Sequence, residues 1–158
     1  MKEYSADFNS RGRGKGIASY YKENFKHVTN IKCEGFSVSK LESKNMDMIG
    51  VYRSQGANDK DLIEKLKMII DNEKITIIGG DMNVCVRANP ENHITKSLTQ
   101  IGFKQIVSES THIEGGVIDH IYLSQNGNIG LKWIIEYFPK YYSDHDGLGL
   151  ILCEEKEE

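Results

Sequence analysis

The sequence has few cysteines, no long apolar run and no dominant charge, and the first two absences exclude whole classes of protein. Its three cysteines are odd in number and widely spaced, without a C-x-x-C pair, which argues against a disulfide framework and a structural zinc site. No apolar run approaches the ~20 residues of a membrane span, and the first residues hold no apolar signal-peptide core. We therefore expect an intracellular protein, nuclear or cytoplasmic, with free and mostly buried thiols, neither secreted nor bound to a membrane.

The weak net charge excludes less. With 20 basic and 23 acidic residues the chain carries −3, so it has no overall basic field that would indicate a nucleic-acid partner, although neutral nucleases remain possible. Its length of 158 residues, with 39% hydrophobic residues, is sufficient for one domain with a real core. We treat residues 1–158 as a single domain and expect residues 1–15 to form a flexible arm and residues 154–158 an acidic tail.

Hydrophobic periodicity predicts two helices and about eight short strands. The helices are expected at residues 59–72 and 92–101, where apolar side chains recur on one helical face. The strands are expected at residues 17–21, around Phe36 and Val38, and at 46–52, 75–81, 106–107, 117–123, 131–138 and 148–153. This order predicts a strand-rich α/β domain in which strand 46–52, helix 59–72 and strand 75–81 form a β-α-β unit.

The stretch Ile77-Ile78-Gly79-Gly80-Asp81-Met82-Asn83-Val84 is the centre of the sequence. A buried strand reaches two glycines, which permit a turn and a close approach of the backbone to a ligand, and a carboxylate and a carboxamide follow. Ligands of open α/β sheets bind outside the carboxyl ends of strands. Asp81 is therefore the first candidate for chemistry, although Asp81 and Asn83 could also cap an ordinary turn.

Two further stretches, residues 116–121 (GVIDHI) and 142–147 (YSDHDG), each place an acid beside a histidine at the edge of an apolar run. Carboxylate and amide oxygens suit Mg²⁺ or Mn²⁺, and such a site suits transfer of a phosphoryl group to water. A carboxylate could also hold a histidine in one orientation. No serine lies in a nucleophile-elbow context, which argues against acyl transfer. If the strand ends converge, the site combines Asp81, Asn83, Asp119, Asp144 and His145.

The stretches GGDMNV, GGVIDHIYL and YSDHDGL, in this order, resemble three motifs of the endonuclease/exonuclease/phosphatase superfamily. Residues 111–116 (THIEGG) and the glycine-rich residues 11–21 are most similar to the endonuclease domains of non-LTR retrotransposons. The resemblance covers roughly residues 10–153. It implies a DNase I-like α/β fold, a four-layer sandwich in which two β-sheets are flanked by helices, and it implies DNA as the partner and Mg²⁺ (or Mn²⁺) as the cofactor.

The resemblance also implies roles for the residues that carry it. Asp81 and Asn83 would position the nucleophilic water and a phosphate oxygen. Asp144 would hold the metal ion, and His145 would contact the scissile phosphate while Asp119 orients its ring.

Five other residues are assigned around this centre. Tyr52 would lie beside the phosphate, Arg53 is a weaker candidate for a phosphate contact, and Asn58 is weaker still. His112 and His120 are expected to be structural. His120 follows Asp119 on a strand, so its side chain should point to the opposite face.

The sequence departs from the superfamily at its start. The family's domain begins with a strand that carries an asparagine and a second strand that carries a metal-binding glutamate, and neither has a counterpart here. The resemblance therefore implies a partial, N-terminally truncated domain with unpaired strand edges. Three functions stay open: a Mg²⁺-dependent DNA endonuclease, a phosphomonoesterase that acts on a small phosphate, and a catalytically inactive module that binds nucleic acid or a protein.

Overall fold

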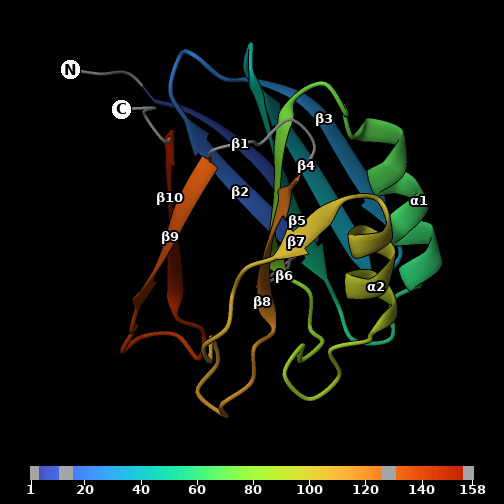
Figure 1. Cartoon of the computed structure of the whole chain (residues 1–158), viewed down its shortest axis with the longest axis vertical. Coiled ribbons are helices and arrows are strands. Elements are labelled where there is room, and N and C mark those ends of the chain that lie inside the picture. The colour runs from blue at the N-terminus through green and yellow to red at the C-terminus, as the bar shows by residue number, and fades with distance from the viewer. Residues whose placement is uncertain (1–3, 11–15, 126–130, 155–158) are drawn as a thin grey trace.

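The computed structural model describes residues 4–10, 16–125 and 131–154, and within them the chain forms ten strands and two helices (Figure 1). The strands are β1 (Ser5–Ser10), β2 (Gly16–Tyr21), β3 (Lys26–Cys33), β4 (Phe36–Glu42), β5 (Met46–Arg53), β6 (Ile75–Asp81), β7 (Phe103–Gln105), β8 (Asp119–Ser124), β9 (Leu131–Phe138) and β10 (Gly147–Glu154). The helices are α1 (Asp59–Ile69) and α2 (His93–Gln100).

The elements form three layers around one six-stranded sheet, whose order is β3-β4-β5-β6-β8-β7. Helices α1 and α2 cover one face, and the two-stranded ribbons β1–β2 and β9–β10 lie on the other (Figure 1). Strands β5 and β6 are parallel and are joined by α1, so the predicted β-α-β unit is confirmed. The other neighbouring pairs of this sheet are antiparallel.

The helical face holds the larger part of the core. Asn58 caps α1 by accepting from the backbone N–H groups of Lys60 and Asp61, which explains why the helix begins at residue 59. The apolar stripe of α1 then packs on side chains from the sheet and from α2. The fully buried members of this cluster include Leu62, Leu66, Ile78, Leu98, Phe36 and Tyr122.

The two glycines of β6 have a different role from the one predicted. They lie inside the strand, which continues to Asp81, rather than ending it. Gly80 has φ +144°, and a Cβ on it would lie 1.9 Å from the carbonyl oxygen of Val51. The close backbone approach is therefore made to the neighbouring strand β5, and only glycine allows it.

Three segments differ from the sequence-based expectations. Residues 5–10, expected within an arm, form β1 and pair with β2. Strand β3 was not predicted, because its inward positions include His27 and Thr29 and therefore lack a fully apolar alternation. The strand expected at residues 106–107 lies instead at Phe103–Gln105. Residues 11–15 and 155–158 lie outside the described part of the chain, so the expectations for them stay open.

Two smaller expectations have mixed outcomes. The three cysteines are free, but Cys33 and Cys85 are only partly buried and Cys153 is exposed, so the thiols are less buried than expected. Within the described residues, neither helix is long and apolar enough to cross a membrane.

The ribbons β1–β2 and β9–β10 leave a groove between them. Among the described residues, β2 pairs only with β1 and β10 pairs only with β9, so each ribbon has a free strand edge, as the comparison with the superfamily predicted. Residues of both edge strands line one groove of about 620 Å³, whose floor is formed by β4, β5, β6 and β8. We call this concavity the β2–β10 groove.

Candidate active site

Three of the predicted residues form a row across the sheet. Tyr52 on β5 is paired in register with Asp81 on β6, and Asp81 is paired with Asp119 on β8. Asp81 lies four residues after Ile77 on β6, and Asp119 lies two residues before Ile121 on β8. Because side chains alternate between the two faces of a strand, each aspartate points to the same face as its isoleucine. Both isoleucines pack toward the ribbons. The row therefore lies on the ribbon face, at one end of the β2–β10 groove.

His145 joins this row through Asp119. Its Nδ1 lies 2.8 Å from Asp119 Oδ2, so a proton on Nδ1 is donated to the carboxylate and Nε2 is left free. Backbone bonds fix the loop that carries His145. The N–H of Ile113 donates to Asp144 O at 2.9 Å, and the N–H of Asp146 donates to Thr111 O at 2.9 Å.

Thr111 fixes Asp119, the other member of the His145–Asp119 pair. It is fully buried, and its hydroxyl oxygen accepts from the backbone N–H groups of Ile118 at 3.2 Å and Asp119 at 3.1 Å. The segment that holds the His145 loop therefore also holds the backbone of Asp119. Sequence reasoning gave Thr111 no role, because its contacts depend on two loops that meet only in the folded chain.

Hydrogen bonds join Asp81, the last residue of β6, to Asn83 in the turn that follows. The backbone N–H of Asn83 donates to Asp81 Oδ1 at 2.9 Å, and its side-chain amide donates to Asp81 Oδ2 at 3.0 Å and to Arg53 O at 2.7 Å. Asn83 has φ +49°, a conformation that asparagine tolerates better than most residues. The predicted carboxylate and amide are therefore brought together, in one fixed orientation.

The environment shifts the pKa of two ionisable groups in the site, Asp81 and His145. Burial raises the pKa of Asp81; the hydrogen bond from the Asn83 backbone opposes this, and the negative charge of Asp119 adds to it. Partial burial alone would lower the pKa of His145. The hydrogen bond to Asp119 and the charges of Asp119, Asp81 and Asp144 outweigh burial, so the pKa of His145 is raised. The shift of His145 therefore favours its protonated form, whereas the shift of Asp81 disfavours its ionised form.

Among the described residues, His112, Asp144 and His145 form a group whose ligand atoms lie within 4.8 Å of one another. The Nδ1 of His112 accepts from the backbone N–H of Glu114 at 3.2 Å, so in the neutral ring Nε2 carries the proton and has no free lone pair for a metal. His112 Nε2 lies 3.6 Å from Asp144 Oδ2, where its proton faces the carboxylate. This arrangement favours His112 as a support for Asp144 rather than as a ligand.

His112 and His120 have different surroundings. His120 is fully buried on the opposite face; its Nε2 faces the carbonyl of Val84 at 2.9 Å and its Nδ1 faces the Tyr122 hydroxyl at 2.8 Å. Burial lowers its pKa. The ring of His112, by contrast, meets the ring of His145 edge-on, with centroids 5.0 Å apart. His112 therefore lies against His145 at the site, and its structural role stays a prediction.

Arg53 does not lie where a phosphate contact would need it. It is 8% exposed, and its guanidinium donates to Asp59 Oδ1 at 2.7 Å, to Met82 O at 3.1 Å and to Ala57 O at 3.5 Å. Those bonds connect the end of β5 to α1 and to the Asp81–Asn83 turn. Arg53 is therefore a structural residue, and its expected phosphate contact is corrected.

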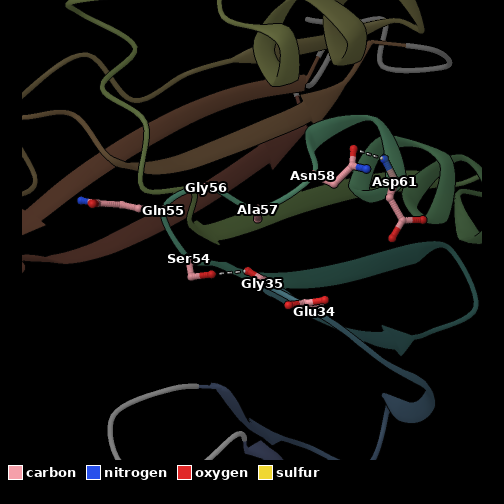
Figure 2. A pocket seen from close by; sticks show the side chains of 8 residues that line it. All are labelled: Glu34, Gly35, Ser54, Gln55, Gly56, Ala57, Asn58 and Asp61. Atoms are coloured by element: carbon pink, nitrogen blue, oxygen red, sulfur yellow. Dashed lines mark hydrogen bonds between the residues drawn. The ribbon is translucent and has the colours of Figure 1, made fainter.

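Asn58 is likewise corrected from a weak phosphate candidate to a helix cap. Figure 2 shows its side chain directed at the backbone of Asp61, at the rim of a cavity of about 520 Å³ between the β3–β4 turn and the β5–α1 loop. The charged residues that line this cavity are Glu34 and Asp61. Two acids without a basic partner in the lining repel a phosphate, so the cavity does not extend the active site.

Comparisons with solved structures identify the fold. The chain is similar to the endonuclease domain of TRAS1, a telomere-specific non-LTR retrotransposon, with a TM-score of 0.67 and 12% identity over 98% of this chain and 80% of that chain. It is similar to an AP endonuclease from Archaeoglobus fulgidus, with a TM-score of 0.69 and 18% identity over 97% and 80%. It also resembles CdtB, the biologically active subunit of cytolethal distending toxin, with a TM-score of 0.60 and 13% identity over 89% and 61%.

Sequence comparison adds no closer relative. No protein-family model matches the chain, and a search of curated proteins gives no significant match. Identities below 20% with similar topology show a common fold and leave the activity to be argued from the site. The layered sheets, the two helices and these structural matches together show that the chain has the DNase I-like fold of the endonuclease/exonuclease/phosphatase superfamily.

Proposed function

We propose that the chain is a divalent-metal-dependent phosphodiesterase that cleaves DNA as an endonuclease of the mobile-element type. The observation that carries the proposal is the row Tyr52, Asp81 and Asp119, with His145 held against Asp119 at 2.8 Å. Acids and an imidazole fixed in this way suit attack of water on a phosphate, because each group has its orientation before the substrate arrives.

Each residue then has a role that its contacts support. His145, with a raised pKa, donates from its free Nε2 to a phosphate oxygen. Asp81, whose burial raises its pKa, accepts a hydrogen bond from the attacking water and orients it. General acid–base groups in such positions contribute ~10²–10⁴-fold to a rate. Asn83 fixes Asp81, and Tyr52 borders the phosphate from β5.

The donor set fits a hard cation. Asp81 and Asp119 are register neighbours whose like charges help to raise the pKa of Asp81, and a bound cation would relieve that repulsion. Asp144, whose side chain is 67% exposed, can add a third carboxylate. Oxygen ligands of this kind suit Mg²⁺ or Mn²⁺. Such an ion, when bound, supplies neutralising charge to the phosphate oxygens.

The rim of the site favours a polymer over a small phosphate. Tyr141, Tyr142 and Ile113 flank the residues that carry His145 and Asp144, and each is more than 80% exposed. Exposed aromatic rings can stack on bases or ribose of a nucleic acid, whereas a phosphomonoesterase would enclose a head group. This observation favours the endonuclease over the phosphomonoesterase.

The proposal is tested with supercoiled plasmid and the purified 158-residue chain. We expect nicking in Mg²⁺ that stops in EDTA, falls at least ~10²-fold in His145→Ala, and is unchanged in the matched control His93→Ala. His93 is exposed at the start of α2, away from the row.

Two results would contradict it. Faster hydrolysis of p-nitrophenyl phosphate than of plasmid, with the same dependence on His145, would make the chain a phosphomonoesterase. Plasmid binding without nicking, unchanged by EDTA in a folded chain, would make it an inactive binding module.

A further inference from the structure

The loop between β9 and β10, residues 139–146, leaves two tyrosine rings outside the fold. Tyr141 is 103% exposed and Tyr142 is 85% exposed, and the same loop carries Asp144 and His145. A tyrosine ring usually stabilises a protein by burying most of its area and giving its hydroxyl group a partner. Two neighbouring rings that bury almost nothing add little to the stability of this chain, so their faces are available to a ligand.

Contacts at both ends fix the loop that carries these rings. The backbone N–H of Asp146 donates to Thr111 O at 2.9 Å, and the N–H of Lys140 donates to Asp146 Oδ1 at 3.3 Å. At the start of the loop the ring of Phe138 lies against Gly149, where a Cβ would come within 2.9 Å of Phe138 Cε2. The tyrosines are therefore presented from an anchored loop, which limits the conformational entropy lost when they bind.

A second exposed apolar side chain comes from the segment paired with this loop. An isolated antiparallel bridge joins His112 to His145, and the N–H of Ile113 donates to Asp144 O at 2.9 Å. Ile113 is 82% exposed. Asp144 and His145 are therefore bordered by exposed apolar surface from two segments of the chain.

The two segments that frame the site have little positive charge with which to attract a DNA backbone. Residues 109–116 and 139–146 contain four acids and one lysine, and the whole chain carries −3. Sequence-independent affinity for duplex DNA comes mainly from cations that neutralise phosphates. Stacking of bases on aromatic rings needs no net charge, so at this rim it is the stronger source of affinity.

Stacking on a side chain selects bases that have left the double helix. Inside a duplex each base is covered by its neighbours in the stack, and the grooves present only the base edges. An unpaired base has a free face, and each stack on an aromatic ring raises the affinity about 10-fold or more. Consecutive Cα atoms are ~3.8 Å apart, so Tyr142, two residues before Asp144, reaches the nucleotides next to a phosphate held at the site.

We propose that this site takes DNA whose bases are unpaired beside the scissile phosphate, and that Tyr141 and Tyr142 stack on those bases. The inference rests on the proposed function, because the loop meets such bases only where Asp144 and His145 face the phosphate of the same strand. Ile113 borders the same nucleotides from the paired segment. The tyrosines then select the form of the substrate, and the catalytic row acts on its phosphate.

The test is equilibrium binding in EDTA, where no strand is cut. Fluorescence anisotropy compares a labelled duplex oligonucleotide with the same duplex carrying a central run of mismatches. We expect the wild-type chain to bind the mismatched duplex at least ~10-fold more tightly. The double variant Tyr141→Leu and Tyr142→Leu should bind both duplexes alike. The double variant Tyr141→Phe and Tyr142→Phe should keep the preference, because a phenylalanine ring also stacks.

Tyr20→Leu is the matched control, since Tyr20 is 67% exposed on β2, in the other ribbon, and this variant should keep the preference. All three tyrosines are exposed, so none of these changes should unfold the chain. Equal wild-type affinity for the two duplexes would overturn the proposal. A preference that survives the double leucine variant, or one that the double phenylalanine variant loses, would overturn it as well.

Plasmid nicking separates this result from the proposed function. A chain that nicks plasmid through His145 but binds both duplexes alike contradicts the proposal for unpaired bases alone. A chain that prefers the mismatched duplex through its tyrosines but never nicks in Mg²⁺ contradicts the enzyme, and it keeps the tyrosines as a surface that binds unpaired DNA.

Discussion

At the scale of single residues, the site depends on side chains that hold other side chains. Thr111 fixes the backbone of Asp119, Asp119 fixes the ring of His145, and Asn83 fixes the carboxylate of Asp81. The residues of the three motifs could be named from the sequence, because acids, an amide and a histidine follow apolar runs. Thr111 and the position of the His112 ring could not be predicted, since both follow from the pairing of two loops.

Replacing Thr111 tests how much its two hydrogen bonds to the backbone of Ile118 and Asp119 stabilise the fold. Thr111→Val keeps the shape but leaves the N–H groups of Ile118 and Asp119 without an acceptor, and an unsatisfied buried donor costs ~1–3 kcal/mol. We expect the free energy of unfolding in urea to fall by about that amount. Thr111→Ser, which keeps the hydroxyl, should lose much less. Equal stability of the valine and serine variants would show that the two bonds do not hold the loop.

The pairing of His145 with Asp119 makes a prediction for its titration in metal-free protein. Asp119→Asn removes the charge and weakens the hydrogen bond that raise the pKa of His145, so that pKa should fall. A group whose pKa is raised by folding stabilises the folded state at pH values below its unfolded-state pKa. This stabilisation is lost as the pH rises through its folded-state pKa. Asp119→Asn should therefore lower the free energy of unfolding more in acid than in base.

Nuclear magnetic resonance of the imidazole, in the presence of EDTA, measures that pKa directly. An unchanged pKa in Asp119→Asn would show that another group controls His145. His27→Gln is a useful assignment control, because His27 contacts Asp7 at 2.8 Å on the β1–β3 side of the molecule.

At the scale of elements, the sequence predicted the strands and helices whose apolar pattern is strong. Both helices, the β5–β6 unit, and β8, β9 and β10 are found within a few residues of their expected positions. Strands β1 and β3 were missed because each has only a short or interrupted apolar alternation, with Ala6 and Phe8 in β1 and with His27 and Thr29 among the inward positions of β3. They form because neighbouring strands β2 and β4 supply hydrogen-bonding partners, which is long-range information absent from a local pattern.

The two glycines of β6 give a matched pair at this scale. A Cβ on Gly80 would lie 1.9 Å from Val51 O at φ +144°, whereas a Cβ on Gly79 would have its nearest contact at 3.7 Å. We expect Gly80→Ala to cost more than ~3 kcal/mol, through backbone strain and separation of β5 from β6. Gly79→Ala should cost much less. Thermal unfolding compares them, and similar melting temperatures would contradict the close contact.

At the scale of the whole molecule, the catalytic row and the β2–β10 groove share one face of the central sheet. The helices cover the other face (Figure 1). The row lies at the end of the groove because Asp81 follows Gly79, a groove residue, at the next inward position of β6. The resemblance implied a layered α/β fold and the residues of the row, but it implied four layers where the described residues form three, and it did not predict that the groove would be lined without charge.

The central claim is that the Tyr52–Asp81–Asp119 row hydrolyses a phosphodiester, and the rate of plasmid nicking by Asp81→Asn tests it most directly. The substitution keeps the size of the side chain and removes the charge that orients water. In Mg²⁺, with the folded state verified by circular dichroism, we expect a rate ~10²–10³-fold below wild type. A folded Asp81→Asn chain that nicks plasmid within a factor of ~3 of wild type would contradict the account.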